Sequence, residues 1–244
     1  MLRNIRLRIE YDGTAYSGWQ LQPEAPTIQG ELERAIGEVA GEEVRIIGSG
    51  RTDAGVHALS QTANFRTGTE IGIERIAAAI NHYLPTDIVV HQAEEVPIEF
   101  HSQYAARAKT YRYLMCTSKR RPALNRHRWA WVRYQLDFEN MLAASKILKG
   151  THDFKSFATE SKDKDTVRTV SRLDLVKDED LISLEITANG FLYNMVRSVA
   201  GALIDVGRGH ISVEDVAEML EAKNREKGGP VAPACGLYLV GVEY

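Results

Sequence analysis

Hydrophobic and polar residues alternate near the start of the chain. Residues 5–11 read Ile-Arg-Leu-Arg-Ile-Glu-Tyr, a period of two that is typical of a strand with one buried face. Further on, Ile28, Leu32 and Ile36 are spaced to form one apolar stripe on a helix, and Thr27 before them is a suitable N-cap. The pattern therefore predicts a strand followed by a helix through about Val39.

The same two periods predict the remaining elements. The first half adds strands at residues 43–47, 60–66 and 87–96 and a helix at 73–83, which completes a β-α-β-β-α-β order. The second half predicts strands at 106–116, 167–176, 181–187 and 237–242, with helices at 137–149, 193–206 and 212–222. We expect an α+β protein of two related α/β halves, residues 1–104 and 105–244, with adjoining, mostly antiparallel sheets.

Charge is distributed unevenly along the chain. The formal net charge is −3, yet residues 101–136 contain no Asp or Glu. A local positive track of this kind can bind a phosphate backbone, and interleaved aromatic rings can stack on unpaired bases. The alternative is a basic surface strand whose aromatic side chains point into the core. The stretch holds the cations Arg107, Lys109, Arg112, Lys119, Arg120, Arg121, Arg126, Arg128 and Arg133, and the aromatics Tyr104, Tyr111, Tyr113, Trp129, Trp131 and Tyr134.

Composition excludes several classes of protein. With 244 residues and 44% hydrophobic residues the chain can bury a full core. It has no apolar run long enough for a membrane span and no signal-peptide pattern, so we expect a cytoplasmic protein. Cys116 and Cys235 lie far apart, and the histidines lack the spacing of metal ligands, so we expect no disulfide, metal or cofactor. Residues 159–166 and 223–233 are candidates for mobile loops.

The most informative segment is the glycine-rich loop at residues 48–58, Gly-Ser-Gly-Arg-Thr-Asp-Ala-Gly-Val-His-Ala. Its glycines fit neither the Walker spacing nor Gly-x-Gly-x-x-Gly before a helix, so it is no nucleotide-phosphate cradle. It is instead a tight loop between two strands that presents Arg51, Asp53 and His57. By turn preferences alone, an aspartate in such a loop is more often a turn-former than a catalyst.

Residues 50–58 of this loop resemble the signature loop of the bacterial tRNA pseudouridine synthase A family. Five more segments resemble the family, and together they extend the likeness nearly from end to end: Tyr-Asp-Gly-Thr at 11–14, Gly-Trp-Gln at 18–20, Lys-Thr-Tyr-Arg-Tyr at 109–113, Asn-Gly-Phe-Leu-Tyr-Asn-Met-Val-Arg at 189–197, and Ala-Pro-Ala-Cys-Gly-Leu at 232–237. The resemblance implies the pseudouridine synthase fold with an active cleft between the halves. It also implies a homodimer that isomerises uridines at positions 38 to 40 of the tRNA anticodon stem-loop without a cofactor.

The resemblance implies roles for four residues. Asp53 would be the nucleophile, attacking either C6 of the base or C1′ of the ribose, because a carboxylate is nucleophilic at neutral pH. Arg51 would fill the space left by the flipped nucleotide or hold the adjacent phosphate. Tyr111 would stack on the uracil and assist proton transfer, unless it is a core aromatic. Arg197 would pair with the catalytic carboxylate, unless it is a surface residue with a buried stem.

The remaining candidates concern RNA contacts. We expect Lys109, Arg112, Arg126 and Arg128 to bind the substrate, and His57 either to contact RNA or to pack the loop. Two other functions remain open. A non-catalytic RNA-binding module would use the basic stretch alone, and an N-glycosidic hydrolase would use the flipped base and the carboxylate but release free uracil.

Overall fold

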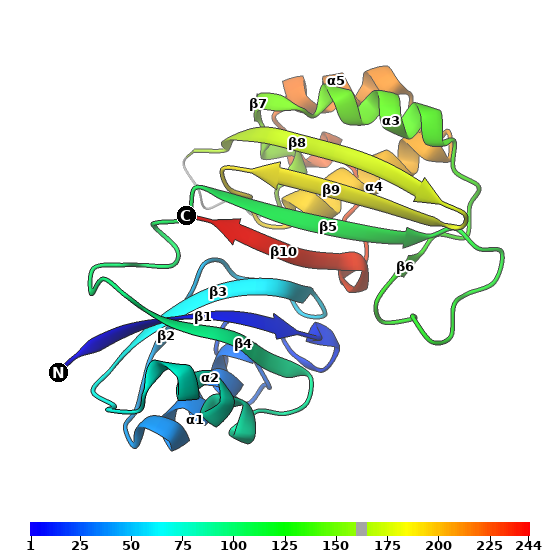
Figure 1. Cartoon of the computed structure of the whole chain (residues 1–244). Helices are drawn as coiled ribbons and strands as arrows, with labels where there is room; N and C mark the ends of the chain where they lie inside the picture. The colour runs from blue at the N-terminus through cyan, green and yellow to red at the C-terminus, as the bar shows by residue number, and fades with distance from the viewer. Residues whose placement is uncertain (160–164) are drawn as a thin grey trace. The chain divides into compact units, whose positions relative to one another are not determined.

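The computed structural model describes residues 1–159 and 165–244, so most of the loop expected at 159–166 lies outside the described residues (Figure 1). The described chain divides into two compact units. The first comprises Met1–Arg107 with Tyr238–Tyr244, and the second comprises Ala108–Leu237. The boundary therefore falls after Arg107 and not after residue 104, and residues 238–244, which include most of the last strand, group with the first unit. The division into two related halves stays a prediction.

The first unit contains the expected β-α-β-β-α-β order. Strands β4, β1 and β3 are neighbours in that order, and both pairs are antiparallel. Strand β2 pairs antiparallel with β3, and β10 pairs parallel with β3. Both helices lie on one side of these strands (Figure 1). The elements are β1 (Arg3–Tyr11), η1 (Gly13–Ala15), α1 (Ile28–Ala40), β2 (Ile46–Gly48), β3 (His57–Thr67), α2 (Ile73–Tyr83), β4 (Ile88–Val96) and β10 (Leu237–Glu243).

The second unit places strands β5, β9, β8 and β7 side by side, all antiparallel, with the short β6 parallel to β5. Helices α3, α4 and α5 gather on one side of these strands (Figure 1). The α+β class and the mostly antiparallel pairing are therefore confirmed. The elements are β5 (Ala108–Cys116), β6 (Ala130–Trp131), α3 (Phe138–Ile147), β7 (Gly150–Asp153), η2 (Lys155–Phe157), β8 (Val167–Asp178), β9 (Leu181–Ala188), α4 (Met195–Gly207), α5 (Val213–Ala222), η3 (Arg225–Lys227) and η4 (Ala234–Gly236).

Helix α1 shows how local sequence sets these elements. The Thr27 hydroxyl accepts a hydrogen bond from the Gly30 N–H at 3.2 Å, as expected for the N-cap. The apolar stripe is buried, since Ile28, Leu32 and Ile36 are each at most 1% exposed. The helix ends at Ala40, one residue beyond the expected end near Val39, and Gly41 caps it with a φ of 70° that glycine readily adopts. The N-cap and the periodicity therefore predicted the start of this helix and, to within one residue, its end.

Non-local pairing changes other boundaries. Strand β3 begins at His57 and not at residue 60, because Tyr238 and Leu239 of β10 pair with His57 and Ala58. The glycine-rich loop is correspondingly shorter than expected. Strand β2 covers only three residues, Ile46–Gly48, in place of residues 43–47. Strands β6 and β7 were not predicted, because each is too short to show a period.

The described ranges also bear on membrane spans and metal sites. None of the helices there is long and apolar enough to cross a membrane. Within the same residues, no group of three or more His, Cys, Asp or Glu side chains could hold a metal ion.

Candidate active site

Asp53 lies in the loop between β2 and β3, and the backbone of this loop is anchored on both sides. The Val56 N–H donates to the Asp53 carbonyl oxygen at 3.1 Å, which closes a tight turn, and Gly55 within it has a φ of 76°. At the base of the loop, the Gln61 side-chain amide donates to the Gly50 carbonyl oxygen at 3.0 Å. The turn expected of this aspartate is therefore present, and it leaves the carboxylate half-buried at the loop.

The segment after β1 supports the loop from the other side. The Trp19 N–H donates to the Thr52 carbonyl oxygen at 2.9 Å. The Tyr11 hydroxyl is 2.8 Å from the Thr52 hydroxyl, and both side chains are buried. Burial raises the pKa of Tyr11 to about 12, so this hydrogen bond joins two neutral hydroxyls at neutral pH. Thr52, directly before Asp53, is thus held through both its backbone and its side chain.

Gly18 allows this close approach. A Cβ built on Gly18 would lie 2.7 Å from the Thr52 carbonyl oxygen, and the residue has a φ of 99°. Any side chain would therefore push the loop away and would also strain the backbone. Residues 11–14 and 18–20 therefore position the loop. Their hydrophobic and polar pattern did not predict this role.

His57 lies at the base of the loop with 2% of its surface exposed. Its Nδ1 accepts a hydrogen bond from the Gly13 N–H at 3.1 Å, and its ring stacks on Tyr238 with centroids 4.7 Å apart. This burial argues against the RNA contact expected for His57 and favours the alternative, packing of the loop. Arg51, in contrast, is exposed.

Tyr111 lies on β5 in the second unit, on its packed face. The side chain is 8% exposed, and its ring meets Phe191 edge-on with centroids 5.0 Å apart. Lys109, two residues earlier on the same face, is half-buried, and burial lowers the pKa of its ammonium group. The burial of Tyr111 matches the core aromatic that the sequence left open. Stacking of this ring on a uracil stays a prediction.

Arg197 lies in the first turn of α4, and two acceptors hold its guanidinium. Its Nε donates to the Ala232 carbonyl oxygen at 2.8 Å, and its Nη1 donates to the Asn194 side-chain oxygen at 2.9 Å. The head group is therefore fixed within the second unit, unlike that of an unattached surface arginine. Because Asp53 belongs to the first unit, the pairing of Arg197 with Asp53 stays a prediction.

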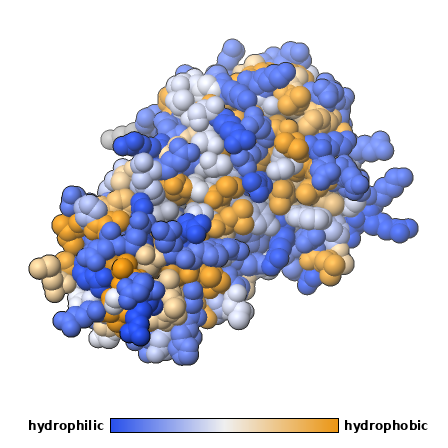
Figure 2. Space-filling view, in the orientation of Figure 1, coloured by the Kyte–Doolittle hydropathy of each residue, from blue (hydrophilic) through white to orange (hydrophobic). Residues whose placement is uncertain are grey.

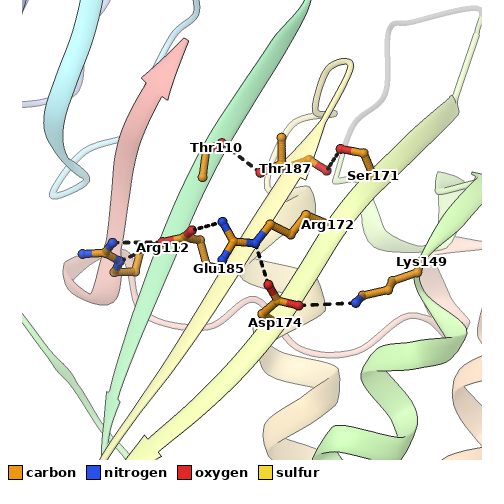
Figure 3. Close-up of polar contacts among 8 residues, drawn as sticks. All are labelled: Thr110, Arg112, Lys149, Ser171, Arg172, Asp174, Glu185 and Thr187. Atoms are coloured by element: carbon orange, nitrogen blue, oxygen red, sulfur yellow. Dashed lines mark hydrogen bonds and ion pairs between the residues drawn. The ribbon is translucent and has the colours of Figure 1, made fainter. Parts of the chain in front are cut away.

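The expected RNA ligands differ in their surroundings. Arg112 faces away from Tyr111 and is paired with Glu185 at 2.9 Å. Glu185 also pairs with Arg172 at 3.0 Å, and the chain of charges continues through Asp174 to Lys149 (Figure 3). A phosphate would therefore compete with Glu185 for Arg112, which weakens the case for this residue as an RNA ligand.

Arg126 and Arg128 lie in the loop between β5 and β6, and both are exposed. The Arg126 guanidinium donates to the Ala123 carbonyl oxygen at 3.0 Å within the loop, and next to these residues Leu124 is 93% exposed. In the space-filling view, hydrophilic side chains project along the edge of the second unit near β6 (Figure 2). The loop therefore presents cations outward, as a phosphate-binding surface requires.

The chain has full-length relatives among known proteins. A family model described as tRNA pseudouridine synthase matches residues 8–105 and 144–244. The chain is 49% identical over 244 residues to a protein of Caldicellulosiruptor bescii and 46% identical to one of Acetivibrio thermocellus, with 100% of each chain covered. Both relatives are named tRNA pseudouridine synthase A.

Among solved structures, an archaeal box H/ACA sRNP Nop10-Cbf5 complex contains a chain that resembles this one only distantly. The TM-score is 0.37 at 11% sequence identity, with 92% of this chain and 60% of the other covered. The family model and the full-length relatives decide the assignment without it. The chain belongs to the tRNA pseudouridine synthase family.

Proposed function

We propose that this protein isomerises uridine to pseudouridine in tRNA, at positions 38 to 40 of the anticodon stem-loop, with Asp53 as the nucleophile. The observation that carries the mechanism is the anchored loop of the first unit. Thr52 is held by Tyr11 and Trp19, so the adjacent Asp53 carboxylate is presented from a backbone that is already in place. Preorganisation of this kind is what a nucleophile needs.

The reaction needs few groups from the protein. The N1–C1′ bond of the uridine breaks, the base turns, and a C5–C1′ bond forms; the proton on C5 leaves and N1 of the product carries a proton. Asp53 would form the transient covalent bond, to C6 or to C1′. A uridine paired in a stem would have to be flipped out to reach it, with exposed Arg51 filling the gap or holding a phosphate.

The other assignments follow from the same proposal. Arg197 would pair with the carboxylate, Tyr111 would stack on the uracil, and Lys109, Arg126 and Arg128 would contact RNA. We also infer a homodimer in the cytoplasm, where tRNA is found. Sedimentation equilibrium should give twice the mass of the chain, and a monomer at working concentrations would exclude the dimer.

The direct test is Asp53→Asn, assayed on unmodified tRNA without added metal or nucleotide. We expect pseudouridine formation to be lost, by at least about a thousandfold, because the amide is no nucleophile, while tRNA affinity stays close to that of the parent. Asp178→Asn, the same change at an exposed site in the second unit, is the matched control.

The outcomes separate the alternatives. Equal activity in Asp53→Asn and the parent would exclude the nucleophile. Binding of tRNA by the parent without any pseudouridine would support an RNA-binding module. Mass analysis identifies a hydrolase, because isomerisation leaves the mass of the RNA unchanged, whereas release of uracil lowers it.

A further inference from the structure

The start of helix α4 differs from those of helices α1, α3 and α5. Thr27, Asp137 and Ser212 each use the side chain to cap the backbone of the helix that follows. Asn194, the N-cap of α4, makes no such bond and has a left-handed backbone with a φ of 60°. Non-glycine residues rarely adopt this conformation, and surrounding contacts have to maintain it.

The Asn194 carboxamide is engaged by two other side chains. Its oxygen accepts from Nη1 of Arg197 at 2.9 Å, and its nitrogen donates to the Thr159 hydroxyl at 2.6 Å. Because the nitrogen is bound to Thr159, the oxygen is turned toward Arg197. The helix loses a backbone cap, and the arginine gains a directed acceptor.

A second segment holds the same guanidinium from another direction. The Ala232 carbonyl oxygen accepts from Nε of Arg197 at 2.8 Å, and the Ala232 N–H donates to the Arg197 carbonyl oxygen at 3.1 Å. This segment touches α4 directly, since a Cβ on Gly201 would lie 1.8 Å from the Pro230 carbonyl oxygen. Residues 223–233, expected to be a candidate for a mobile loop, are packed against the helix here.

Two acceptors on different nitrogens define the plane of a guanidinium, whereas a single acceptor lets it rotate. We propose that Asn194 is a positioning residue: its carboxamide orients the Arg197 guanidinium for the catalytic carboxylate. This inference rests on the proposed function, in which Arg197 pairs with Asp53. In this role Asn194 would act through Arg197 and not on the substrate itself.

Two substitutions separate the carboxamide from the backbone conformation. Asn194→Gly permits the left-handed backbone and removes the acceptor. Asn194→Asp tolerates the same backbone and keeps an oxygen for Arg197. We expect the single-turnover rate of pseudouridine formation to fall about tenfold or more in Asn194→Gly, since small misplacements of a catalytic group are costly. Asn194→Asp should recover most of that loss, and tRNA affinity should change in neither.

A double-mutant cycle with Arg197→Lys tests whether Asn194 acts through the arginine. A lysine ammonium group has no plane for two acceptors to orient. In the Arg197→Lys background, Asn194→Gly should therefore lower the rate of pseudouridine formation little further. Both rates are measured at single turnover with excess enzyme. Thr159→Val, which removes only the anchor of the carboxamide, should show a smaller loss with the same dependence on Arg197. Asn140→Gly, at an exposed asparagine of α3, is the control for a glycine in a helix.

Two results would overturn the inference. One is a single-turnover rate in Asn194→Gly equal to that of the parent, and the other is an equal fractional loss of rate in the parent and Arg197→Lys backgrounds. If Asn194→Gly does not fold, judged by its thermal unfolding, the Thr159→Val cycle decides by the same criterion. If the parent itself formed no pseudouridine, the proposed function would fail, and full activity in Asp53→Asn would exclude the nucleophile. Neither outcome depends on Asn194, so these failures are distinguishable from a failure of the inference.

Discussion

At the scale of single residues, the catalytic proposal depends on what holds Asp53 in place. The hydrogen bonds act mostly on its neighbour Thr52, whose carbonyl oxygen accepts from the Trp19 N–H and whose hydroxyl bonds to the Tyr11 hydroxyl. Tyr11 and Thr52 are 41 positions apart in the sequence. An aspartate that is a turn-former by local preference can therefore also be a prepositioned nucleophile, because its backbone conformation is maintained by residues outside the loop.

Gly18→Ala tests this support. The methyl group would meet the Thr52 carbonyl oxygen at 2.7 Å, so the loop or the segment at 18–20 must shift. We expect a loss of about 1–3 kcal/mol in the free energy of unfolding, from strain and clash together, and slower pseudouridine formation. Urea unfolding and a single-turnover assay measure the two effects.

Gly41→Ala is the matched control for this change. Gly41 also has a positive φ, 70°, but nothing lies within 4 Å of a Cβ built there. It should lose about 1 kcal/mol from backbone strain alone and keep its catalytic rate. If both variants lost the same stability and neither lost rate, the close approach of Gly18 to the loop would be irrelevant to catalysis.

At the scale of elements, α4 is joined to the segment after η3 by close backbone contact. Glycine in a helix is usually a weak point, and its replacement by alanine stabilises an exposed helix by up to about 1 kcal/mol. In α4 we expect alanine to destabilise the helix instead, because Gly201 faces the Pro230 carbonyl oxygen without room for a side chain.

We therefore expect Gly201→Ala to destabilise the protein by roughly 1–3 kcal/mol, as overpacking does. Gly37→Ala in α1 should have the opposite sign, since its Cβ would make ordinary contact at 3.5 Å with the Glu42 carbonyl oxygen. Thermal unfolding of both variants gives the two signs. If Gly201→Ala were more stable than the parent, residues 223–233 would move aside easily and would not hold the Ala232 carbonyl group in place.

At the scale of the whole molecule, RNA binding should depend on local charge and not on the net charge of −3. The loop between β5 and β6 presents Arg126 and Arg128 to solvent, whereas Arg112 is paired with Glu185. The basic stretch of the sequence is therefore not a uniform RNA surface. Its loop is the part best suited to phosphate contacts.

Reversing both arginines, Arg126→Glu with Arg128→Glu, should weaken tRNA binding and lower the slope of log affinity against log salt by about one for each phosphate that the variant no longer neutralises. Lys146→Glu with Lys177→Glu makes the same change in net charge at exposed positions outside the loop. Binding titrations from low to high salt compare the pairs. An identical slope in the loop variant and the parent would remove these arginines from the RNA surface.

Features that neighbouring residues encode could be predicted from the sequence, and features that depend on residues distant in the sequence could not. Helix α2 was predicted at its observed bounds, Ile73–Tyr83, and α1 with its Thr27 cap, because periodicity and capping act over a few residues. Asp53 was proposed as the nucleophile from the contiguous string around it, and this role stays a prediction. The extra residues at the start of β3 were missed, since their partner is β10 at the other end of the chain.

The sequence by itself determined the order of the helices and the longer strands, the α+β class and the family signature, all of which are carried by neighbouring residues. Only the tertiary structure decided that Tyr11 and Gly18 support the loop, that His57 is buried, and that Asn194 and Ala232 both hold the Arg197 guanidinium. It also neutralised Arg112 with Glu185, which lies 73 residues away. Such contacts leave no local period or cap in the chain, because they are set by packing between elements that are distant in sequence.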